Sequence, residues 1–524
     1  MTSVRRIADT TPTGLGVLLI LEPRVARASQ PWAERCNPFG IARKVIIICA
    51  LTAFLSGCAL SKPPTHSQVL TNALPQGTTL PALWSSTTNT NPVAGDWLKS
   101  FNDARLDAIV AEAITNNLDL RQAAARVEMA RQNVVVVASQ MKPQVGASFR
   151  LASTHDQGQN EWYNSTHALA GVAWEPDVWG RLRAQRAAAQ AGYQATALDY
   201  AYARQSLAAT VARSWYMTIE TSQLVTLAEQ SAVIYSNLLN LVKIRRAAGK
   251  VSDLDVAEAG ANLNAAQNDL QSAQGLASEA RRDLEVLLGR YPGAEVKVAE
   301  NFAPLPPPVQ PGLPSSLLER RPDIAAAEQE VLAAFRAQEV AKLALLPSFT
   351  LNLDGGKLSD DLLSVLRLNP WMVSAAVGMY VPIYTGGALR AQIKIATAQQ
   401  QRAVAGYGSI ALRAFREVEN GLTNEQLLAQ RLQFQQAELR DRVESVRIAT
   451  LQYKAGSTDL LSVLQLQSDQ IASQANLIKL RNVQLANRID LHLALGGSFE
   501  AAPPTLTSAS GTGLGKQEDA RGPN

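Results

Sequence analysis

The sequence predicts a mainly α-helical protein with a smaller membrane-type β portion, built from two tandem copies of one unit. Three observations predict this. Sequence anchors recur at an almost constant offset, each copy holds a helical tract far longer than the globular average, and each copy holds two strand-like segments. The chain has 524 residues, of which 47% are hydrophobic and only 18% charged, so disorder driven by charge is excluded for most of its length.

Residues 1–57 are predicted to be a leader that ends in a lipoprotein signal peptide. Arg43 and Lys44 precede an apolar run that is too short to span a bilayer, which takes roughly 20 apolar residues. A charged start, an apolar centre and a small-residue end are typical of a signal peptide, although a buried core helix is the alternative. The run ends in Leu55, Ser56, Gly57 and Cys58.

Charge and cysteine content exclude several kinds of site. Residues 1–57 hold seven Lys/Arg and three Asp/Glu, a net of 7 − 3 = +4, which equals the formal charge of the whole chain. The rest is balanced, so we expect no nucleic acid partner, because phosphate neutralisation needs surplus cations. Cys36 and Cys49 lie in the leader, so a mature chain that starts at Cys58 has no disulfide and no Cys-ligated metal.

Five anchors recur in the same order, with offsets from 323 − 119 = 204 to 495 − 288 = 207. They predict two structural repeats, residues 96–300 and 301–500, between an N-terminal linker at 58–95 and a flexible tail at 501–524. The anchor pairs are Asp119-Leu120 with Asp323-Ile324, Trp174–Gly180 with Tyr380–Gly386, Leu182–Gln185 with Leu389–Gln392, Ala248-Gly249 with Ala455-Gly456, and Leu288-Gly289 with Leu495-Gly496.

Each repeat is predicted to open with a helix that stops at a proline and is followed by a β-hairpin. The helices are Leu106–Met141 and Pro322–Leu345. The hairpins, at 145–176 and 348–382, alternate apolar and polar residues and suit either membrane strands of about 9–11 residues or a short soluble hairpin. Their strands are predicted at Val145–Ser153, Ala168–Pro176, Ser348–Asp354 and Trp371–Pro382, and His155 and His167 are expected to be solvated loop residues.

A long helical hairpin is predicted to close each repeat, at 182–288 and 388–495. In the first copy, Leu182–Ala247 is a helix of roughly 100 Å, and a turn at Ala248-Gly249 sends a second helix back. That second helix carries a heptad pattern, which predicts coiled-coil packing. The heptad residues are Val256, Leu263, Leu270, Ala277 and Leu284, with Ala259, Ala266, Ala273, Ala280 and Leu287 three positions further on.

Four strands cannot close a barrel alone, since single-chain barrels begin at eight. Strands in lipid need every backbone group bonded, so membrane strands here require several copies that share one transmembrane β-barrel.

The chain resembles the TolC-like outer-membrane factors, and among them the lipid-anchored, NodT-like outer-membrane components of RND efflux systems. The resemblance spans about residues 58–499. It is carried by the segment Leu55–Cys58, the motifs Trp174–Arg183, Arg321–Glu328, Leu346–Ser348 and Val381–Gly387, and the two Ala-Gly helix turns.

The resemblance implies a homotrimer in the outer membrane, with a twelve-stranded barrel, a helical tunnel across the periplasm and a covalent lipid on Cys58. Its partners would be a periplasmic adaptor protein, an inner-membrane RND pump and outer-membrane lipid. Proline and glycine suit the change from strand to helix, because proline ends ladder pairing and glycine has no Cβ to clash. These residues are Pro176, Gly180, Pro382, Gly386 and Gly387.

The helix turns are expected to form the periplasmic entrance and a possible gate. In several family members acidic residues after the second turn ring this entrance, but here Ser462 and Gln465 stand at those positions. The matching positions after the first turn are acidic. Three copies of Asp255 and Glu258 could ring the lumen and bind cations, or they could pair with an adaptor. Asp253 and Asp459 could instead cap helices. The tip residues are Gly249, Asp253, Asp255, Glu258, Gly456 and Asp459.

No enzyme motif is present, and we expect neither a metal nor a cofactor besides the lipid. Gly249-Lys250 and Gly515-Lys516 both lack the residues of a phosphate-binding loop. The expected function is a passive duct that exports small molecules; a type I protein-secretion duct and a non-transporting periplasmic coiled coil are the alternatives. Interfacial aromatic residues are expected at Trp162, Tyr163, Trp174, Trp179, Trp371 and Tyr380, unless these pack at soluble strand ends.

Overall fold

The computed structural model describes residues 60–500, except 76–77, 79, 88, 90, 94 and 360–371. The predicted leader, the lipidation segment Leu55–Cys58, Trp371 and the tail from residue 501 lie outside the described residues.

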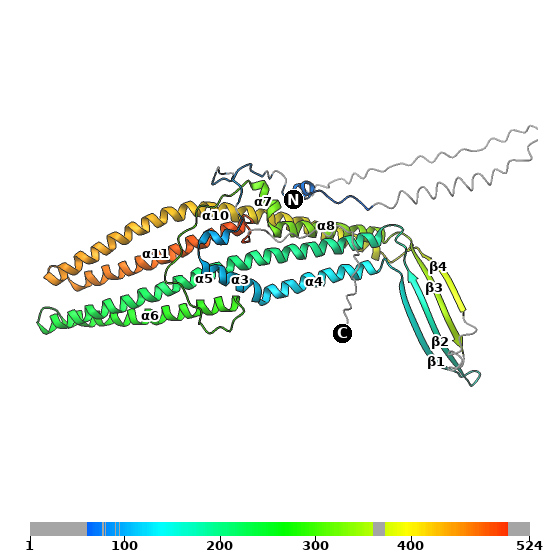
Figure 1. Cartoon of the computed structure of the whole chain (residues 1–524), viewed down its shortest axis with the longest axis horizontal. Coiled ribbons are helices and arrows are strands. Elements are labelled where there is room, and N and C mark those ends of the chain that lie inside the picture. The colour runs from blue at the N-terminus through cyan, green and yellow to red at the C-terminus, as the bar shows by residue number, and fades with distance from the viewer. Residues whose placement is uncertain are drawn as a thin grey trace, which may run out of the picture. The chain divides into compact units, whose positions relative to one another are not determined.

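The two repeats fold alike, with strands at one end and helix turns at the other (Figure 1). The offset of the long helices is 388 − 181 = 207, which matches the sequence anchors. The first repeat comprises α3 (Ala104–Asn116), α4 (Leu118–Ser139), β1 (Gln144–Asp156), β2 (Glu161–Trp174), α5 (Arg181–Ala247) and α6 (Asp253–Leu287). The second comprises α7 (Pro314–Arg320), α8 (Pro322–Leu343), β3 (Ser348–Ser359), β4 (Met372–Tyr380), α10 (Ala388–Ala455) and α11 (Leu460–Ala494).

Two expectations about these elements are wrong. The predicted helix Leu106–Met141 is broken at Asn117, whose side chain accepts from Leu120 N at 3.0 Å and so starts α4 as a separate helix. The first hairpin has longer strands than expected, because β1 and β2 continue to a tight turn at residues 157–160. His155 and His167 therefore lie within strands, where they pair with Trp162 and Arg150.

The joint between helices is built alike in both repeats. Asn117 Nδ2 donates to the carbonyl of Leu287 at 2.9 Å, and Arg321 Nη1 donates to the carbonyl of Ala494 at 3.0 Å. Each bond joins the start of the strand-proximal helix to the last turn of the returning helix, so it satisfies a carbonyl that the helix end leaves free. The repeats thus share one architecture with different side chains.

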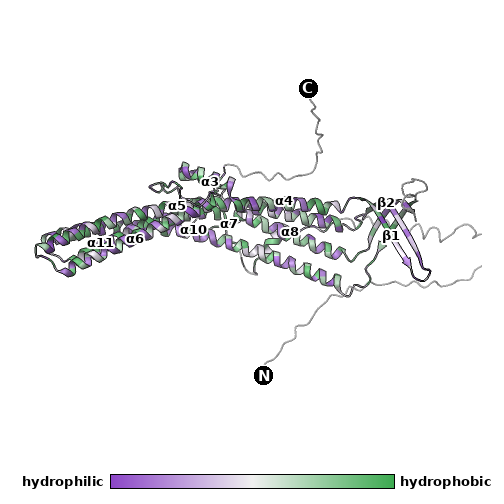
Figure 2. Ribbon diagram, turned by 90° about the horizontal axis from the view of Figure 1, so that it is seen from below, coloured by the Kyte–Doolittle hydropathy of each residue, from purple (hydrophilic) through white to green (hydrophobic). Residues whose placement is uncertain are grey.

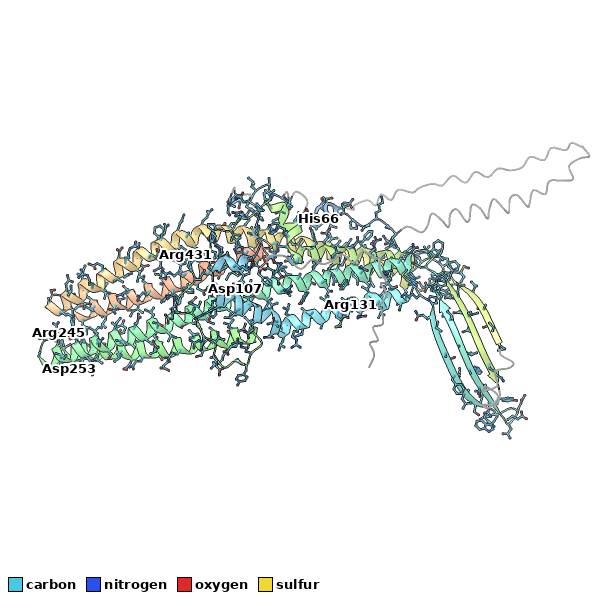
Figure 3. The ribbon with its side chains drawn as sticks, viewed as in Figure 1. His66, Asp107, Arg131, Arg245, Asp253 and Arg431 are labelled. Atoms are coloured by element: carbon cyan, nitrogen blue, oxygen red, sulfur yellow. The ribbon has the colours of Figure 1, made fainter. Side chains whose placement is uncertain are left out.

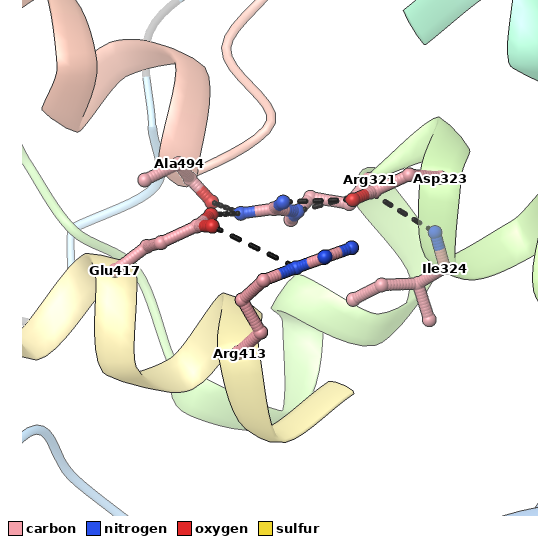
Figure 4. Close-up of polar contacts among 6 residues, drawn as sticks. All are labelled: Arg321, Asp323, Ile324, Arg413, Glu417 and Ala494. Carbon is pink, nitrogen blue, oxygen red and sulfur yellow. Dashed lines mark hydrogen bonds and ion pairs between the residues drawn. The ribbon is translucent and has the colours of Figure 1, made fainter. Parts of the chain in front are cut away.

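Arg321 carries the larger network of the two joints (Figure 4). Its side chain is only 1% exposed and forms two bonds to Asp323, at 3.0 and 2.8 Å, and one to Glu417 at 2.7 Å. Although burial alone lowers the pKa of Arg321, the two carboxylates raise it above its ordinary value. The guanidinium therefore ties α8, α10 and α11 together.

The long helices pack as the heptads predict. All ten heptad residues of α6 are buried or half-buried, and α6 packs mainly against α5. Figure 2 shows hydrophobic and hydrophilic residues alternating along these helices, as amphipathic packing requires. Aromatic residues fill the core where α3, α5 and α6 meet, and Phe101, Trp215 and Tyr216 are fully buried there.

The linker that precedes the first repeat lies along the second. Its helix α2 (His66–Ala73) packs against α10, where Gly408 has no side chain to obstruct the carbonyl of Ala73. His66 Nδ1 lies 2.8 Å from Glu328 of α8, and Trp84 is buried and donates to the carbonyl of Gly312. The linker is thus bound along α8 and α10.

Candidate functional site

The four strands form one antiparallel sheet in the order β1-β2-β3-β4, so the two hairpins pair through β2 and β3. Within the described residues, strands pack against strands and no helix covers the sheet. Among the strands that the structure describes, the outer edges of β1 and β4 have no neighbour. A sheet with two open edges exposes unpaired backbone groups and invites pairing with another chain.

One face of this sheet is apolar and exposed. Residues directly opposite in an antiparallel register share a face, which assigns each side chain. Val145 is 79% exposed and Val377 77% exposed, although a soluble protein would bury such residues. The apolar residues of this face include Val145, Ala147, Phe149, Leu151, Ala168, Ala170, Val172, Phe349, Leu351, Leu353, Val373, Ala375, Val377 and Met379, and Lys357, opposite Ala168, lies on the same face.

The opposite face is more polar, although Leu169 and Met372 also lie on it. Gly146, Gly171, Asp354 and Ser374 form one row across the four strands. The Asp354 carboxylate leans over Gly171, where an added Cβ would meet its Oδ1 at 2.2 Å. Arg150 and His167 form a neighbouring cross-strand pair on the same face. A sheet with one apolar and one polar face suits a wall between lipid and water.

The expected interfacial aromatic residues divide between several places. Trp174 and Trp162 lie on the apolar side near opposite ends of β2, and Trp174 Nε1 donates to the carbonyl of Met141 at 3.0 Å. Tyr163 and Tyr380 lie on the polar side. Trp179 lies outside the sheet, and its Nε1 donates to the carbonyl of Pro347 at 2.7 Å. Of the expected aromatic residues that the structure describes, Trp162 and Trp174 thus lie on the apolar face.

Glycines make the change from strand to helix at the predicted motifs. Gly180 (φ 84°) starts α5, and Gly386 (φ 62°) and Gly387 (φ 86°) precede α10; these left-handed conformations suit glycine. Pro176 and Pro382 line one cavity of about 290 Å³ at this junction. The two prolines singled out in the sequence therefore meet in space.

Asp177 caps α5 from outside the helix. Its carboxylate accepts from Leu182 N at 3.0 Å and from Arg183 N at 2.9 Å, which Gly180, lacking a side chain, cannot do. The first described residue, Leu60, lies against Gly180, where an added Cβ would approach it to 3.3 Å. The linker therefore begins beside the junction of sheet and helices.

The helix turns hold the other predicted residues, and Figure 3 places Arg245 and Asp253 at the end far from the strands. Gly249 (φ 71°) and Gly456 (φ 84°) adopt left-handed conformations at the two reversals. Asp459 caps α11 by accepting from Ser462 N at 2.7 Å, which confirms its capping interpretation. That backbone bond, the largest cause, lowers the pKa of Asp459.

The cap of α6 is Ser252, so the capping interpretation of Asp253 is wrong. Asp253 instead pairs with Arg246 of α5, and the hydrogen bond from Arg246 lowers the pKa of Asp253. Asp255 completes the cap, because its carboxylate accepts from Ser252 N at 2.7 Å. Glu258 is half-buried one turn further on. Asp253 and Asp255 thus stabilise the start of α6.

A contact between the two turns escaped the sequence prediction. Arg245 Nη1 donates to the carbonyl of Tyr453, and the guanidinium lies over the Tyr453 ring, 4.4 Å from its centroid. Burial, the largest cause, and the nearby Asp255 raise the pKa of Tyr453, while Arg245 opposes them. Because the partners are 208 residues apart, no local pattern in the sequence indicates this link between the two helix turns.

The described residues offer no group of three or more His, Cys, Asp or Glu arranged to hold a metal ion. None of the helices within that part of the chain is both long enough and apolar enough to cross a membrane.

Comparisons with known proteins agree with this arrangement. The outer membrane efflux protein family model matches residues 109–290 and 313–497. The chain is 30% identical to the pyoverdine export outer membrane protein OpmQ of Pseudomonas aeruginosa over 477 residues, 88% of this chain and 98% of the relative. It is 27% identical to the cation efflux system protein CusC of Escherichia coli over 467 residues, 87% of this chain and 99% of the relative.

The same fold occurs in the crystal structure of the CmeC outer membrane channel of Campylobacter jejuni. The TM-score is 0.75 and the identity 19%, over 85% of this chain and 95% of that one, a likeness that shows the fold alone. Together with the family match, the two-repeat fold and its uncovered amphipathic sheet place the chain in the class of outer-membrane channels. The chain belongs to the outer membrane efflux protein family.

Membership confirms the resemblance, the outer-membrane location and the efflux function expected from the sequence. It favours efflux over the secretion duct and the non-transporting coiled coil.

Proposed function

We propose that three copies of this chain form a passive duct that carries small molecules across the outer membrane as the last part of a tripartite RND efflux system. The amphipathic sheet with two open edges carries this proposal. Each chain supplies four strands, so pairing β4 of one copy with β1 of the next closes twelve strands and satisfies both edges. The apolar face would then meet lipid and the polar face the lumen.

A pair of matched variants on β4 tests this arrangement. Val377→Lys places a charge on the apolar face, which costs roughly 2–4 kcal/mol near the middle of a bilayer. Ser374→Lys places the same charge on the polar face. We expect Val377→Lys to reduce trimers in the outer membrane and Ser374→Lys to assemble with altered single-channel conductance.

The mass of the detergent-extracted protein should correspond to three chains. Equal assembly of both variants, or a stable monomer that retains its strands, would contradict the shared barrel.

The helix turns are proposed as the gate, supported by the Arg245–Tyr453 contact that holds the two turns of one chain together. Arg245→Ala should raise the resting conductance in planar bilayers, since the turns lose their link. Arg246→Ala is the matched control, because the neighbouring guanidinium pairs within the first turn, with Asp253. Equal conductance changes in both variants would remove Arg245 from the gate.

A ring of Asp255 and Glu258 at the entrance also remains a proposal. Asp255→Asn keeps an acceptor for the Ser252 cap, so its combination with Glu258→Gln changes charge with little loss of structure. Changed cation selectivity would place the acids at the lumen. Unchanged selectivity with lost pump-dependent efflux would place them against an adaptor.

Lipidation of Cys58 is proposed to fix the N-terminus at the membrane. It is supported by the sequence Leu55–Cys58 and by Leu60, the first described residue, which lies against Gly180 at the junction of sheet and helices. Cys58→Ser should abolish lipid labelling. A mature N-terminus upstream of Cys58 by mass spectrometry would refute the assignment.

The identity of the partner pump can be tested directly. Relatives are named for pyoverdine export and for cation efflux, so the family accepts chemically different cargo. A periplasmic adaptor and an inner-membrane RND pump are the proposed partners. Co-purification of the trimer after cross-linking in cells should recover both, and recovery of a protein-secretion pump instead would contradict the proposal.

A further inference from the structure

The two longest helices differ in how they are covered. α5 packs against α4 and α6 of its own repeat and also against α8 and α11 of the second repeat. α10 packs against α8 and α11 of its own repeat and against α2, but within the described residues neither α4 nor α6 packs on it to a comparable extent. In Figure 1, α10 and α6 lie on opposite sides, with α11 and α5 between them. One side of α10 therefore has no helix pair to match the one that covers α5.

The repeat offset of 388 − 181 = 207 identifies the residues on this side of α10. In the interface between the repeats, Glu220 of α5 accepts from Asn482 of α11 at 2.6 Å and is 9% exposed. Leu227, seven residues further along the same face, is 8% exposed. Their equivalents on α10 are Leu427, which is 51% exposed, and Phe434, which is 74% exposed. Two large apolar side chains thus stand uncovered where their counterparts are buried.

The first repeat carries a surface that fits these side chains. The equivalent of α11 is α6, at an offset of 460 − 253 = 207, and the equivalent of Asn482 is Gly275. An added Cβ at Gly275 would meet nothing within 4 Å. Gly275 belongs to a row of small, exposed residues that share one face of α6 and leave room for Leu427 and Phe434. The row is Ala261, Ala265, Asn268, Ser272 and Gly275.

A polar pair fixes the alignment of the two surfaces. Within the chain, Arg213 of α5 pairs with Asp490 of α11. The equivalents are Asn420 of α10 and Asp283 of α6, and both are exposed. The amide of asparagine can donate to the carboxylate, so a hydrogen bond can replace the ion pair at this position. The pairs Asn420–Asp283 and Leu427–Gly275 follow the same register as the two pairs that join α5 to α11.

Helix α4 extends the surface toward the strands. Met129 and Val136 of α4 are seven residues apart, and they are 71% and 61% exposed. The equivalent of α4 is α8, at an offset of 322 − 118 = 204, and the equivalent residues Ala333 and Val340 are half-buried. The apolar surface of the first repeat therefore runs along α4 as well as α6.

We propose that the uncovered side of α10 is the docking site for α4 and α6 of a neighbouring copy, with Phe434 as its central apolar anchor. This inference rests on the duct of three copies proposed above, and it adds the helix faces and the register in which the copies meet. Each copy then binds its neighbour as its first repeat binds its second, and this head-to-tail contact closes into a ring. A buried aromatic side chain near the centre of an interface contributes strongly to its stability.

The two kinds of interface around the duct differ in chemistry. The interface within a chain contains the Arg213–Asp490 ion pair and the buried Glu220 carboxylate. The interface between copies replaces Arg213 with Asn420 and Glu220 with Leu427, so it depends more on apolar burial.

Paired cysteines test the register, since a mature chain that starts at the lipidated Cys58 has no free thiol. In the purified assembly, Leu427→Cys with Gly275→Cys should give dimer and trimer bands on a denaturing gel after treatment with a short bifunctional thiol reagent. Gln426→Cys with Gly275→Cys is the control, because the Gln426 side chain donates to the linker carbonyl of Ser86, on another side of α10. This control should give several-fold less of both bands.

The outcomes separate this inference from the proposed function. An assembly with the mass of three chains but without the cross-linked bands would overturn the inference and leave the duct standing. Equal bands in both pairs, or a cross-link within one chain, would also overturn it. Loss of the trimer mass in the unmodified protein would instead contradict the proposed function. An adaptor as the occupant of α10 would leave the purified assembly without the bands.

Truncation of the anchor provides the second measurement. Phe434→Ala removes an exposed side chain, so the single chain should keep its helices while the trimer fraction in detergent falls several-fold. Leu451→Ala is the matched control: Leu451 is a 54% exposed residue of α10, and its equivalent Ile244 stays 68% exposed beside the second repeat. Equal trimer fractions for the two variants would refute Phe434 as the anchor.

Discussion

Replacement of Arg321 by methionine should be among the most destabilising single changes at the joint between helices. The guanidinium is 1% exposed, and it holds Asp323, Glu417 and the carbonyl of Ala494 at once. Methionine fills much of the volume but leaves the Asp323 side chain, which is 11% exposed, without its counter-ion. Removal of one partner of a buried ion pair costs roughly 3–5 kcal/mol, because the remaining charge stays uncompensated.

The other repeat supplies the matched comparison. Asn117→Ala breaks the equivalent bond to Leu287 and the cap of α4, which together cost roughly 1–2 kcal/mol. Adding Asp323→Asn to Arg321→Met should recover most of the loss, because it removes the unpaired charge. The assay is the unfolding midpoint of the detergent-solubilised protein, with the loss of helix monitored by circular dichroism.

Two results would refute this reasoning. If Arg321→Met is no less stable than Asn117→Ala, the ion pair contributes no more than a neutral cap does. If the double variant is less stable than Arg321→Met alone, the unpaired carboxylate is not the source of the loss.

Three further changes have expected outcomes. Burial, with a contribution from a nearby arginine, lowers the pKa of His492 to about 3, so the unfolded chain takes up a proton first as the pH falls below about 6.5. Stability that depends on a neutral His492 should therefore fall by roughly 2 kcal/mol between pH 7 and pH 5, and His492→Phe should flatten the pH dependence of the unfolding midpoint. Gly408→Ala places a Cβ 2.4 Å from the carbonyl of Ala73, so proteolysis of the linker should accelerate, whereas Gly406→Ala, with open space around it, should leave the cleavage rate unchanged. Gly289→Ala should lower the unfolding midpoint, since the φ of 72° costs an alanine about 1–2 kcal/mol and its Cβ would meet a backbone carbonyl at 2.8 Å; an unchanged midpoint would contradict the need for glycine.

The periodic and local features of the chain were predictable from its sequence. The anchors located both copies, and the heptads of α6 identified the residues that pack, because side chains seven apart share a helix face. Asp459 as a cap and the glycines before α5 and α10 followed from the conformations that these residues favour. The family resemblance and efflux function also followed, because the ordered motifs are specific together.

Contacts between distant segments were decided only by the tertiary structure. The bond from Asn117 to Leu287 depends on how the start of α4 meets the end of α6, and the link of Arg245 to Tyr453 depends on how the two helix turns approach each other. Strand length was underestimated, because polar residues of β1 and β2 read as a loop until cross-strand pairing supplies their hydrogen bonds. Local preference fixes which element a segment forms, whereas partners more than a hundred residues apart are chosen by packing, which no single stretch of sequence encodes.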